Sequence, residues 1–180
     1  VWLVCATDGN AGTVDAEMLE GYASTSQLRA AELCCAAQEL GLRGVDWLGY
    51  RDSGMAGSPE NQHPESLVQA PMEALVGQIA SSIRRHRPQV VICDNQFGGY
   101  GHPDHIAIGQ LTTAAIACAA DPSFDSGSGD AEPHRVSKLY FIAWSRKRWD
   151  AYQAALRKLV VKVDGQERQA VPWPDWALTT

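Results

Sequence analysis

The sequence predicts an α/β fold built on a mostly parallel β-sheet with helices on both faces. Short apolar runs such as VVIC, residues 90–93, are typical of strands that are covered on both faces. These runs alternate along the chain with longer segments whose apolar residues follow a helical period. Strands that alternate with helices usually form a parallel sheet, and the ligand site of such a sheet lies at the carboxyl ends of its strands.

Local signals place each element along the chain. The first apolar run ends in TDGNAG, a turn-rich loop that is typical of a strand leaving a sheet. Gly41 is a candidate C-cap for the first helix, and Pro88 marks the end of the second. Residues 57–64 and 121–134 are rich in Gly, Pro and polar side chains, which predicts surface loops. The predicted strands are residues 1–6, 45–50, 90–93, 136–144 and 160–163, and the predicted helices are residues 24–40, 67–86, 105–120 and 149–159.

Composition limits the classes of function. The 180 residues, 45% of them hydrophobic, have the size of one domain, which we assign to residues 1–180. A net charge of −6 argues against nucleic acid or an anionic membrane as the main partner. No apolar run approaches the roughly 18 residues that span a membrane. The five cysteines form no CxxC pair and no even disulfide framework, which favours a reducing, cytoplasmic location.

The stretch richest in chemically active side chains is GGYGHPDH, residues 98–105. It is compatible with a simple helix start, since proline suits the first turn and an aspartate there is favoured by the helix dipole. It is also compatible with a metal site, because imidazoles three residues apart on one helical turn lie close together. A carboxylate between them can orient an imidazole by accepting its second N–H. One or two histidines do not complete a zinc site, so further ligands have to come from elsewhere.

Polar residues follow three of the predicted strands. Asp8, Asp52 and the GGYGHPDH loop each come directly after a strand. Because the carboxyl ends of parallel strands meet at one edge of the sheet, we expect these residues to converge in one cleft. This expectation comes from topology and not from spacing.

Four stretches follow one another along the chain: VCATDGNAGT after the first strand, LRAAELCCAAQELGL on the first helix, LGYRDSGM after the second strand, and GGYGHPDHIA. Together they resemble the PIG-L/LmbE-like family of zinc-dependent N-deacetylases. The similarity covers residues 1–120 and continues more weakly to the VPWPDW end. Four ordered stretches at compatible spacing are far more specific than one HxxH pattern.

The resemblance implies a Rossmann-like three-layer sandwich and hydrolysis of an N-acyl group, usually acetyl, from an amino sugar or a related conjugate. The implied metal is zinc, or iron in some members. In the family, an A-H-P-D-D motif after the first strand supplies a histidine and an aspartate as ligands and another aspartate as general base. This sequence lacks that motif, and its first residue falls where the family's second strand begins. We therefore expect a sheet without its first strand, and a fragment with both ends truncated.

The resemblance also assigns roles to single residues. His105 resembles the third metal ligand. His102 resembles the histidine that stabilises the tetrahedral intermediate or protonates the leaving amine, with Asp104 orienting it. Tyr100 would help to polarise the amide carbonyl. Arg29 and Asp52 match positions that bind substrate hydroxyls or other polar groups.

Other interpretations remain open at this stage. Arg29 and Glu32 also have the spacing of an ordinary helical ion pair, and Asp52 before Ser53 and Gly54 is a natural turn residue. The chain is also compatible with a non-enzymatic family member that only binds a sugar conjugate. A nucleotide-binding protein of Rossmann type is a further alternative, although TDGNAG is not a GxGxxG that leads into a helix. The sequence indicates no oligomeric state.

Overall fold

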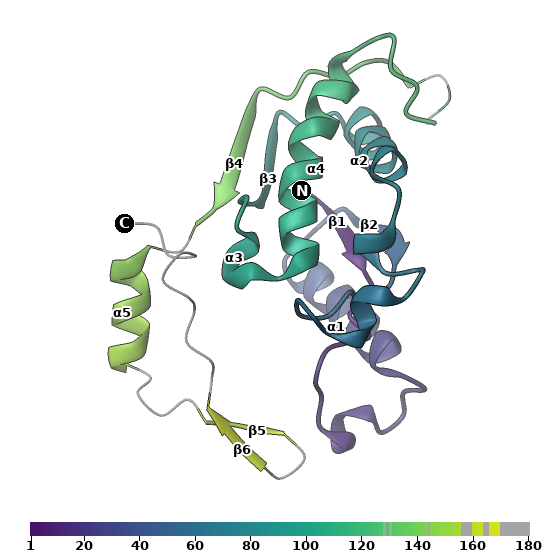
Figure 1. Cartoon of the computed structure of the whole chain (residues 1–180). Helices are drawn as coiled ribbons and strands as arrows, with labels where there is room; N and C mark the ends of the chain where they lie inside the picture. Colours follow the sequence, from purple (N-terminus) through teal and green to yellow (C-terminus); the bar gives the residue numbers. More distant parts are fainter. Residues whose placement is uncertain (128, 130, 144, 156–159, 164–165, 170–180) are drawn as a thin grey trace.

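A computed structural model of the protein describes residues 1–127, 129, 131–143, 145–155, 160–163 and 166–169. Helices and strands alternate along the chain, which confirms the predicted α/β class (Figure 1). Strand β1 (Trp2–Thr7) pairs in parallel with β2 (Gly44–Tyr50), and the chain between them forms α1 (Thr25–Glu39). Strand β3 (Val90–Asp94) pairs in parallel with β4 (Lys138–Ile142), and α4 (Pro103–Ala120) lies between these two strands in sequence.

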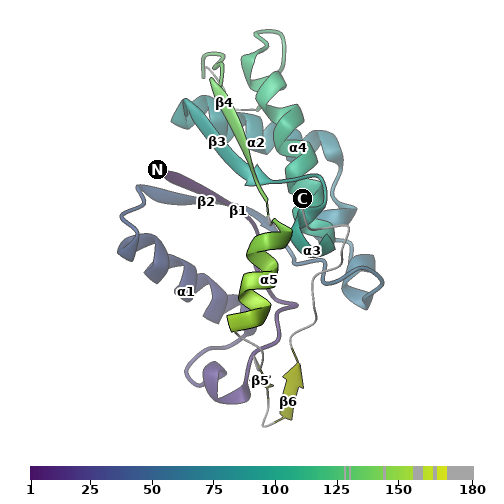
Figure 2. The same cartoon turned by 90° about the vertical axis from the view of Figure 1, so that its left-hand side faces the viewer.

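The two parallel pairs do not join into one sheet. Within the described residues, β1 has a ladder only with β2, and β3 only with β4. Both views place β1 on the side of its pair that faces β3 (Figures 1 and 2). In the part of the chain that the structure describes, the edges of β1 and β3 that face each other therefore have no ladder partner. Within each of these two pairs the strands are parallel, as predicted.

Helices cover both sides of the β1–β2 pair. Figure 2 shows α1 on one side and α2 (Met72–His86) with α4 on the other, which is the layering expected of a three-layer sandwich. Ser24 is the N-cap of α1, and its hydroxyl accepts the backbone N–H of Gln27 at 3.2 Å. The helix ends at Glu39 with Leu40 as its C-cap, and Gly41 follows with a φ of 64°, which allows the Leu42 N–H to donate to Ala37 O at 2.9 Å. The left-handed glycine therefore ends the helix as predicted.

The second predicted helix, residues 67–86, is two elements. A 3-10 turn, η3 (Leu67–Gln69), precedes the break, and α2 starts only at Met72. Pro71 lies at the N-cap position of α2. A proline has no N–H and its ring clashes with the preceding turn, so a continuous helix through residue 71 is excluded. The prediction gave too little weight to this proline.

The main core lies where α2 packs against α4 and η3. Ala80 of α2 and Ala115 and Ala119 of α4 are fully buried, so the two helices approach closely. Larger side chains fill the space around these alanines. The buried cluster consists of Leu67, Leu75, Val76, Ile79, Ala80, Ile83, Ala115 and Ala119. Helix α4, which carries the HPDH residues at its N-terminal end, is therefore anchored through its C-terminal half.

The later elements differ from the predictions in their bounds. Strand β4 is shorter than residues 136–144, and Trp144 lies outside the described residues. Helix α5 (Arg146–Ala155) starts three residues before the predicted 149, because the Ser145 hydroxyl accepts Arg148 N at 3.2 Å and caps it. Residues 156–159, predicted as the end of this helix, also lie outside the described residues. Strand β5 (Val160–Val163) was predicted, but its antiparallel partner β6 (Gln166–Gln169) was not, because QERQ lacks apolar alternation.

The remaining segments are short turns and loops. The loop predicted at residues 57–64 contains a 3-10 turn, η2 (Pro59–Gln62), and another, η1 (Ala16–Leu19), follows β1. The described part of residues 121–134 contains no helix or strand, in agreement with the prediction. Among the helices that the structure describes, none combines the length and the apolar character that crossing a bilayer requires.

Candidate active site

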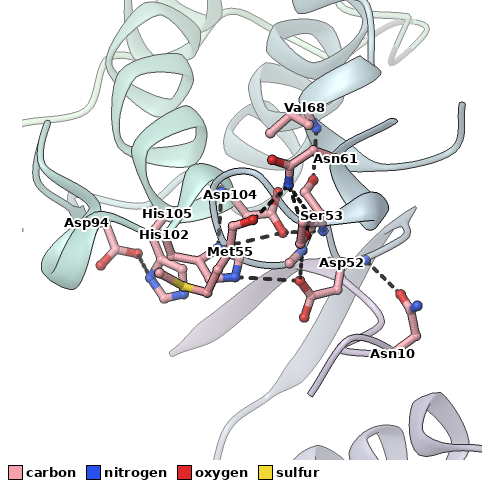
Figure 3. Close-up of polar contacts among 12 residues, drawn as sticks. Asn10, Asp52, Ser53, Met55, Asn61, Val68, Asp94, His102, Asp104 and His105 are labelled. Carbon is pink, nitrogen blue, oxygen red and sulfur yellow. Dashed lines mark hydrogen bonds and ion pairs between the residues drawn. The ribbon is translucent and has the colours of Figure 1, made fainter. Parts of the chain in front are cut away.

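The polar residues after β2 and at the end of β3 come together with the N-terminal end of α4, and Asn10, in the loop after β1, accepts the backbone N–H of Asp52 (Figure 3). Asp52 follows β2 and Asp94 is the last residue of β3. His102 is the N-cap of α4, and Pro103 occupies the first helical turn as predicted. The convergence that topology predicted is therefore present between the segments after β2 and β3, which lie about 40 to 50 residues apart in sequence.

His102 is held by the start of its own helix. Its Nδ1 accepts the backbone N–H of Asp104 at 3.2 Å, in the manner of an N-cap. A ring whose Nδ1 accepts a hydrogen bond carries the proton of its neutral form on Nε2. This Nε2 faces Asp52 Oδ1 at 3.6 Å. The side chain of His102 is buried apart from a small exposed fraction, so its orientation is set by these two neighbours.

Asp104 lies beside His102 but forms its hydrogen bonds with another segment. Its Oδ2 accepts the backbone N–H of Ser53 at 3.0 Å and lies 4.0 Å from His102 Nδ1. Its Oδ1 is buried and has no hydrogen-bond partner within the described part of the chain. Burial raises the pKa of the Asp104 carboxyl, although the hydrogen bonds from Ser53 act in the opposite direction. An unpartnered buried oxygen of this kind is a site to which a polar group can bind.

His105 lies one turn further along α4 and is held differently. Its Nδ1 lies 3.1 Å from Asp94 Oδ2, and 45% of its side chain is exposed. The hydrogen bond to Asp94 raises the pKa of His105, and partial burial only weakens this effect. With Nδ1 engaged by a carboxylate, Nε2 is the nitrogen that remains to bind a ligand. A histidine that binds a metal typically has its second nitrogen held in this way.

Tyr100 borders both imidazoles. Its ring centroid lies 6.0 Å from that of His102 and 5.8 Å from that of His105. Burial raises the pKa of the Tyr100 phenol, and the negative charges of Asp52 and Asp94 raise it further. The phenol therefore remains protonated at neutral pH and can act as a hydrogen-bond donor.

Glycines allow this part of the chain to pack closely. Gly98 has a φ of 58°, and a Cβ there would lie 2.6 Å from Ile106 N, in the first turns of α4. Gly109 lies one turn after His105, where a Cβ would lie 2.7 Å from Asp94 O. Only glycine lets α4 approach the end of β3 this closely, and that approach places Asp94 beside His105.

Arg29 lies on the neighbouring helix and is engaged elsewhere. Its guanidinium bonds Glu32 at 2.7 Å on the exposed surface of α1, the helical pair that the spacing also allowed. Its Cγ lies 3.4 Å from where a Cβ of Gly9 would be, so its stem rests on the loop after β1. Asp52, His102, Asp104, Tyr100 and His105 form one cluster, and Arg29 is not joined to it by a described hydrogen bond.

Sequence reasoning missed three residues of this site. Neither Asp94 nor Gly109 is among the residues proposed from sequence, and Ser53 was named only as the neighbour of the turn residue Asp52. The position of Asp94 directly after a strand, the same signal that selected Asp52, was enough to propose it. No local pattern indicates that Ser53 bonds Asp104, 51 residues away.

The GlcNAc-PI de-N-acetylase family, PIG-L, matches residues 1–116, including every residue of this cluster. The chain belongs to this family. The match confirms the resemblance seen in the four sequence stretches. It also agrees with the α/β fold and its parallel strands.

Curated relatives of this PIG-L chain are named deacetylases. The chain is 40% identical over 156 residues to a 1D-myo-inositol 2-acetamido-2-deoxy-alpha-D-glucopyranoside deacetylase of Thermobifida fusca, covering 82% of this chain and 53% of the relative. It is 41% identical over 136 residues to a similarly named deacetylase of Frankia alni, covering 73% of this chain and 44% of the relative. The chain thus spans about half the length of the curated relatives it matches.

Solved structures support the fold. An N,N'-diacetylchitobiose deacetylase of Pyrococcus horikoshii aligns with a TM-score of 0.60 and 20% identity, covering 87% of this chain and 64% of that one. A 4-carboxy-2-hydroxymuconate hydratase of Pseudomonas putida aligns with a TM-score of 0.54 and 18% identity, covering 79% of this chain and 52% of that one. Because this fold carries both a deacetylase and a hydratase, the reaction has to be argued from the site and not from the fold.

Proposed function

We propose that the protein containing this PIG-L chain is a metal-dependent hydrolase that removes an N-acyl group, acetyl in the first instance, from an amino sugar or a related conjugate. The observation that carries the proposal is the Asp94–His105 pair at 3.1 Å beside His102 and Tyr100. The names of the curated relatives support the substrate class. The partner is then a small molecule, in line with the net charge of −6.

The residues at the end of β3 fit a zinc or iron ion. Asp94 engages His105 Nδ1, which leaves Nε2 of a half-exposed imidazole to coordinate the metal. A catalytic zinc normally takes three protein ligands, so His105 has to be completed by others. We propose that these ligands and the general base lie in parts of the protein beyond these 180 residues, since the relatives are about twice as long. When bound, the metal supplies a Lewis acid for the acyl carbonyl and lowers the pKa of water.

A second ligand group lies within the described residues. Three side chains, those of Asp52, His102 and Asp104, can each offer one atom to a metal ion, and these three atoms lie within 4.8 Å of one another. Two of these side chains are already engaged, because His102 Nδ1 accepts Asp104 N and Asp104 Oδ2 accepts Ser53 N. His105 is favoured as the ligand because a carboxylate holds its Nδ1 and because its side chain is 45% exposed, against 11% for His102. Separate substitutions of His105 and Asp52 distinguish the two groups.

Each remaining residue has a role that its surroundings support. His102 stabilises the tetrahedral intermediate by donating a hydrogen bond from Nε2 or, when it is protonated on both nitrogens, passes the Nε2 proton to the leaving amine. Asp104 helps to fix His102 through the helix start, where its backbone N–H holds Nδ1. Tyr100 donates its phenol hydrogen to the amide carbonyl, a contribution of about 3 kcal/mol for one well-placed donor. Asp52 and Arg29 bind substrate hydroxyls or other polar groups.

The alternatives receive less support. In a dinucleotide site the glycine-rich turn leads directly into a helix, whereas here α1 begins at Thr25, well after β1 ends at Thr7. A family member that only binds a sugar conjugate would share the cleft without hydrolysing the amide, and the activity assay below separates the two. The proposal also includes one domain for residues 1–180 and a cytoplasmic location, for which five unpaired cysteines are the support.

The experiment is an amine-release assay on the full-length protein. Substrates are N-acetylglucosamine linked to inositol and N,N'-diacetylchitobiose, with the metal-depleted protein as control. We expect release of free amine that stops on chelation and returns with zinc or iron. His102→Ala should lower kcat by roughly 10²- to 10⁴-fold, the usual contribution of a general acid. A metal-loaded protein that binds these sugars and releases no amine overturns the hydrolase and favours the binding protein.

A further inference from the structure

Asp8 joins three segments of the chain. It follows β1, and its backbone N–H donates to Tyr50 O at 3.0 Å. Its carboxylate Oδ1 accepts the backbone N–H groups of Asn10 and Asp52, both at 3.1 Å. Its Oδ2 accepts the hydroxyl of Ser26, in the first turn of α1, at 2.9 Å. One side chain therefore connects the loop after β1, the start of α1 and the residue that follows β2.

The contact with Asp52 exceeds what a turn requires. A turn at residue 8 is satisfied by the bond to Asn10 N, two residues on. The bond to Asp52 N spans 44 residues, and Asn10 Oδ1 accepts the same N–H at 3.0 Å (Figure 3). Two acceptors thus hold one backbone N–H.

The held residue is the one that faces His102. With its backbone fixed by Asp8 and Asn10, Asp52 accepts Gly54 N at 2.8 Å through Oδ1. The same oxygen lies 3.6 Å from His102 Nε2, and the side chain is only 16% exposed. A displacement of the Asp52 backbone therefore moves the carboxylate relative to both His102 and a bound substrate. Displacements of about 1 Å in a positioning residue can cost up to roughly a hundredfold in rate.

We infer that Asp8 is a positioning residue for the amide hydrolysis, acting through the backbone of Asp52 to fix the carboxylate that meets the substrate polar groups. The inference rests on the proposed function. Asp8 itself does not touch the reacting atoms. Its effect on substrate binding is exerted through Asp52, and this dependence can be measured as a change in KM.

The test is a set of variants of the full-length, metal-loaded protein in the amine-release assay, with KM and kcat measured separately. Asp52→Ala should raise KM about tenfold, because it removes a charged acceptor for the substrate. Asp8→Ala should raise KM by a similar factor, because it displaces that same acceptor. Asp8→Asn keeps an oxygen for both N–H groups and should stay within about threefold of wild type. In the Asp52→Ala background, Asp8→Ala should change KM by less than about twofold, since residues acting through one another are not additive.

A matched control is available on β2 itself. Asp46 also accepts several side chains, Ser82 at 2.7 Å and His86 at 2.9 Å among them, but near the start of the strand. Asp46→Ala should lower the thermal midpoint and leave KM unchanged within about twofold, which separates lost stability from lost positioning. If Asp8→Ala does not fold, Asn10→Ala removes the other acceptor of Asp52 N and should raise KM by a few fold.

The outcomes separate the two claims. An active wild type whose KM rises with Asp8→Ala and is restored by Asp8→Asn supports the inference. An active wild type in which Asp8→Ala and Asn10→Ala both keep the wild-type KM overturns the inference and leaves the proposed function intact. An equal and additive loss in the Asp52→Ala background also overturns it. A metal-loaded wild type that releases no amine overturns both claims together.

Discussion

Gly109→Ala tests whether the close approach of α4 to β3 creates the metal-binding pair. A Cβ at residue 109 would lie 2.7 Å from Asp94 O and 2.8 Å from Asn95 O, both backbone atoms. Carbon–oxygen contacts rarely close below about 3.3 Å, so α4 and the end of β3 have to separate by roughly 0.5 Å. A shift of that size along the Asp94–His105 contact, now 3.1 Å, lengthens it beyond the usual hydrogen-bond range.

Two free energies follow from this displacement. Overpacking costs about 1–3 kcal/mol, and the better helix propensity of alanine returns up to about 1 kcal/mol, so the unfolding free energy should fall by up to about 2 kcal/mol. Zinc affinity should fall at least about tenfold, because a histidine ligand loses the carboxylate that orients it. Urea unfolding of the metal-free full-length protein measures the first quantity, and zinc titration against a competing chelator measures the second.

Gly77→Ala is the matched control for this experiment. Gly77 also lies inside a helix, α2, but a Cβ there would meet nothing nearer than Ser126 O at 4.0 Å. This variant should gain up to about 1 kcal/mol of stability and bind zinc as wild type does. If Gly109→Ala matches Gly77→Ala in both measurements, the close approach at residue 109 does not create the site, and the reasoning is refuted.

Three further predictions concern the scaffold. Arg84 is buried and donates four hydrogen bonds to the end of α4 and the loop after it. Arg84→Met should therefore lower the free energy of unfolding by about 3 kcal/mol. A loss below about 0.5 kcal/mol in urea unfolding contradicts this. Burial alone would raise the pKa of Asp46, but hydrogen bonds and neighbouring positive charges lower it below 3.8; its stabilisation is therefore present above that pH and lost as the pH falls through the folded pKa. Asp46→Asn should be less stable than wild type at pH 7, and the difference should shrink towards pH 3 in pH-dependent urea unfolding; a constant difference contradicts the assignment. Burial raises the pKa of the Cys93 thiol to about 11, whereas Cys34 and Cys35 are exposed. In the folded protein, a maleimide should therefore label Cys34 and Cys35 and leave Cys93 unlabelled, as measured by mass spectrometry. Labelling of Cys93 contradicts its burial.

Local sequence signals predicted the features that local physics controls. Pro103 at the start of α4, the left-handed Gly41 after α1 and the β-branched run of β3 each act within one turn or strand. Topology predicted that the segments after β2 and β3 would meet. In the structure, Asp52 Oδ1 lies 3.6 Å from His102 Nε2.

The features that sequence could not predict join distant segments. The bonds from Ser53 to Asp104 and from Asp52 to Asp8 link residues 51 and 44 positions apart, and no periodicity or spacing specifies such pairs. Gly109 is needed because of a backbone on another element, so its role appears only once α4 is packed on β3. Pro71 is a feature that the sequence could have predicted, since a proline ends or starts a helix through local effects. The predicted helix 67–86 followed the apolar pattern and ignored this proline.

The metal content of full-length variants tests the central claim most directly. We predict about one zinc or iron per chain in the wild type, none in His105→Ala, and one in His86→Ala. His86 is the matched control, because it also pairs with a carboxylate, Asp46 at 2.9 Å, but is stacked on Trp2 away from the cleft. A His105→Ala protein that keeps its metal while Asp52→Ala loses it would contradict the account and transfer the ion to the Asp52, His102 and Asp104 group.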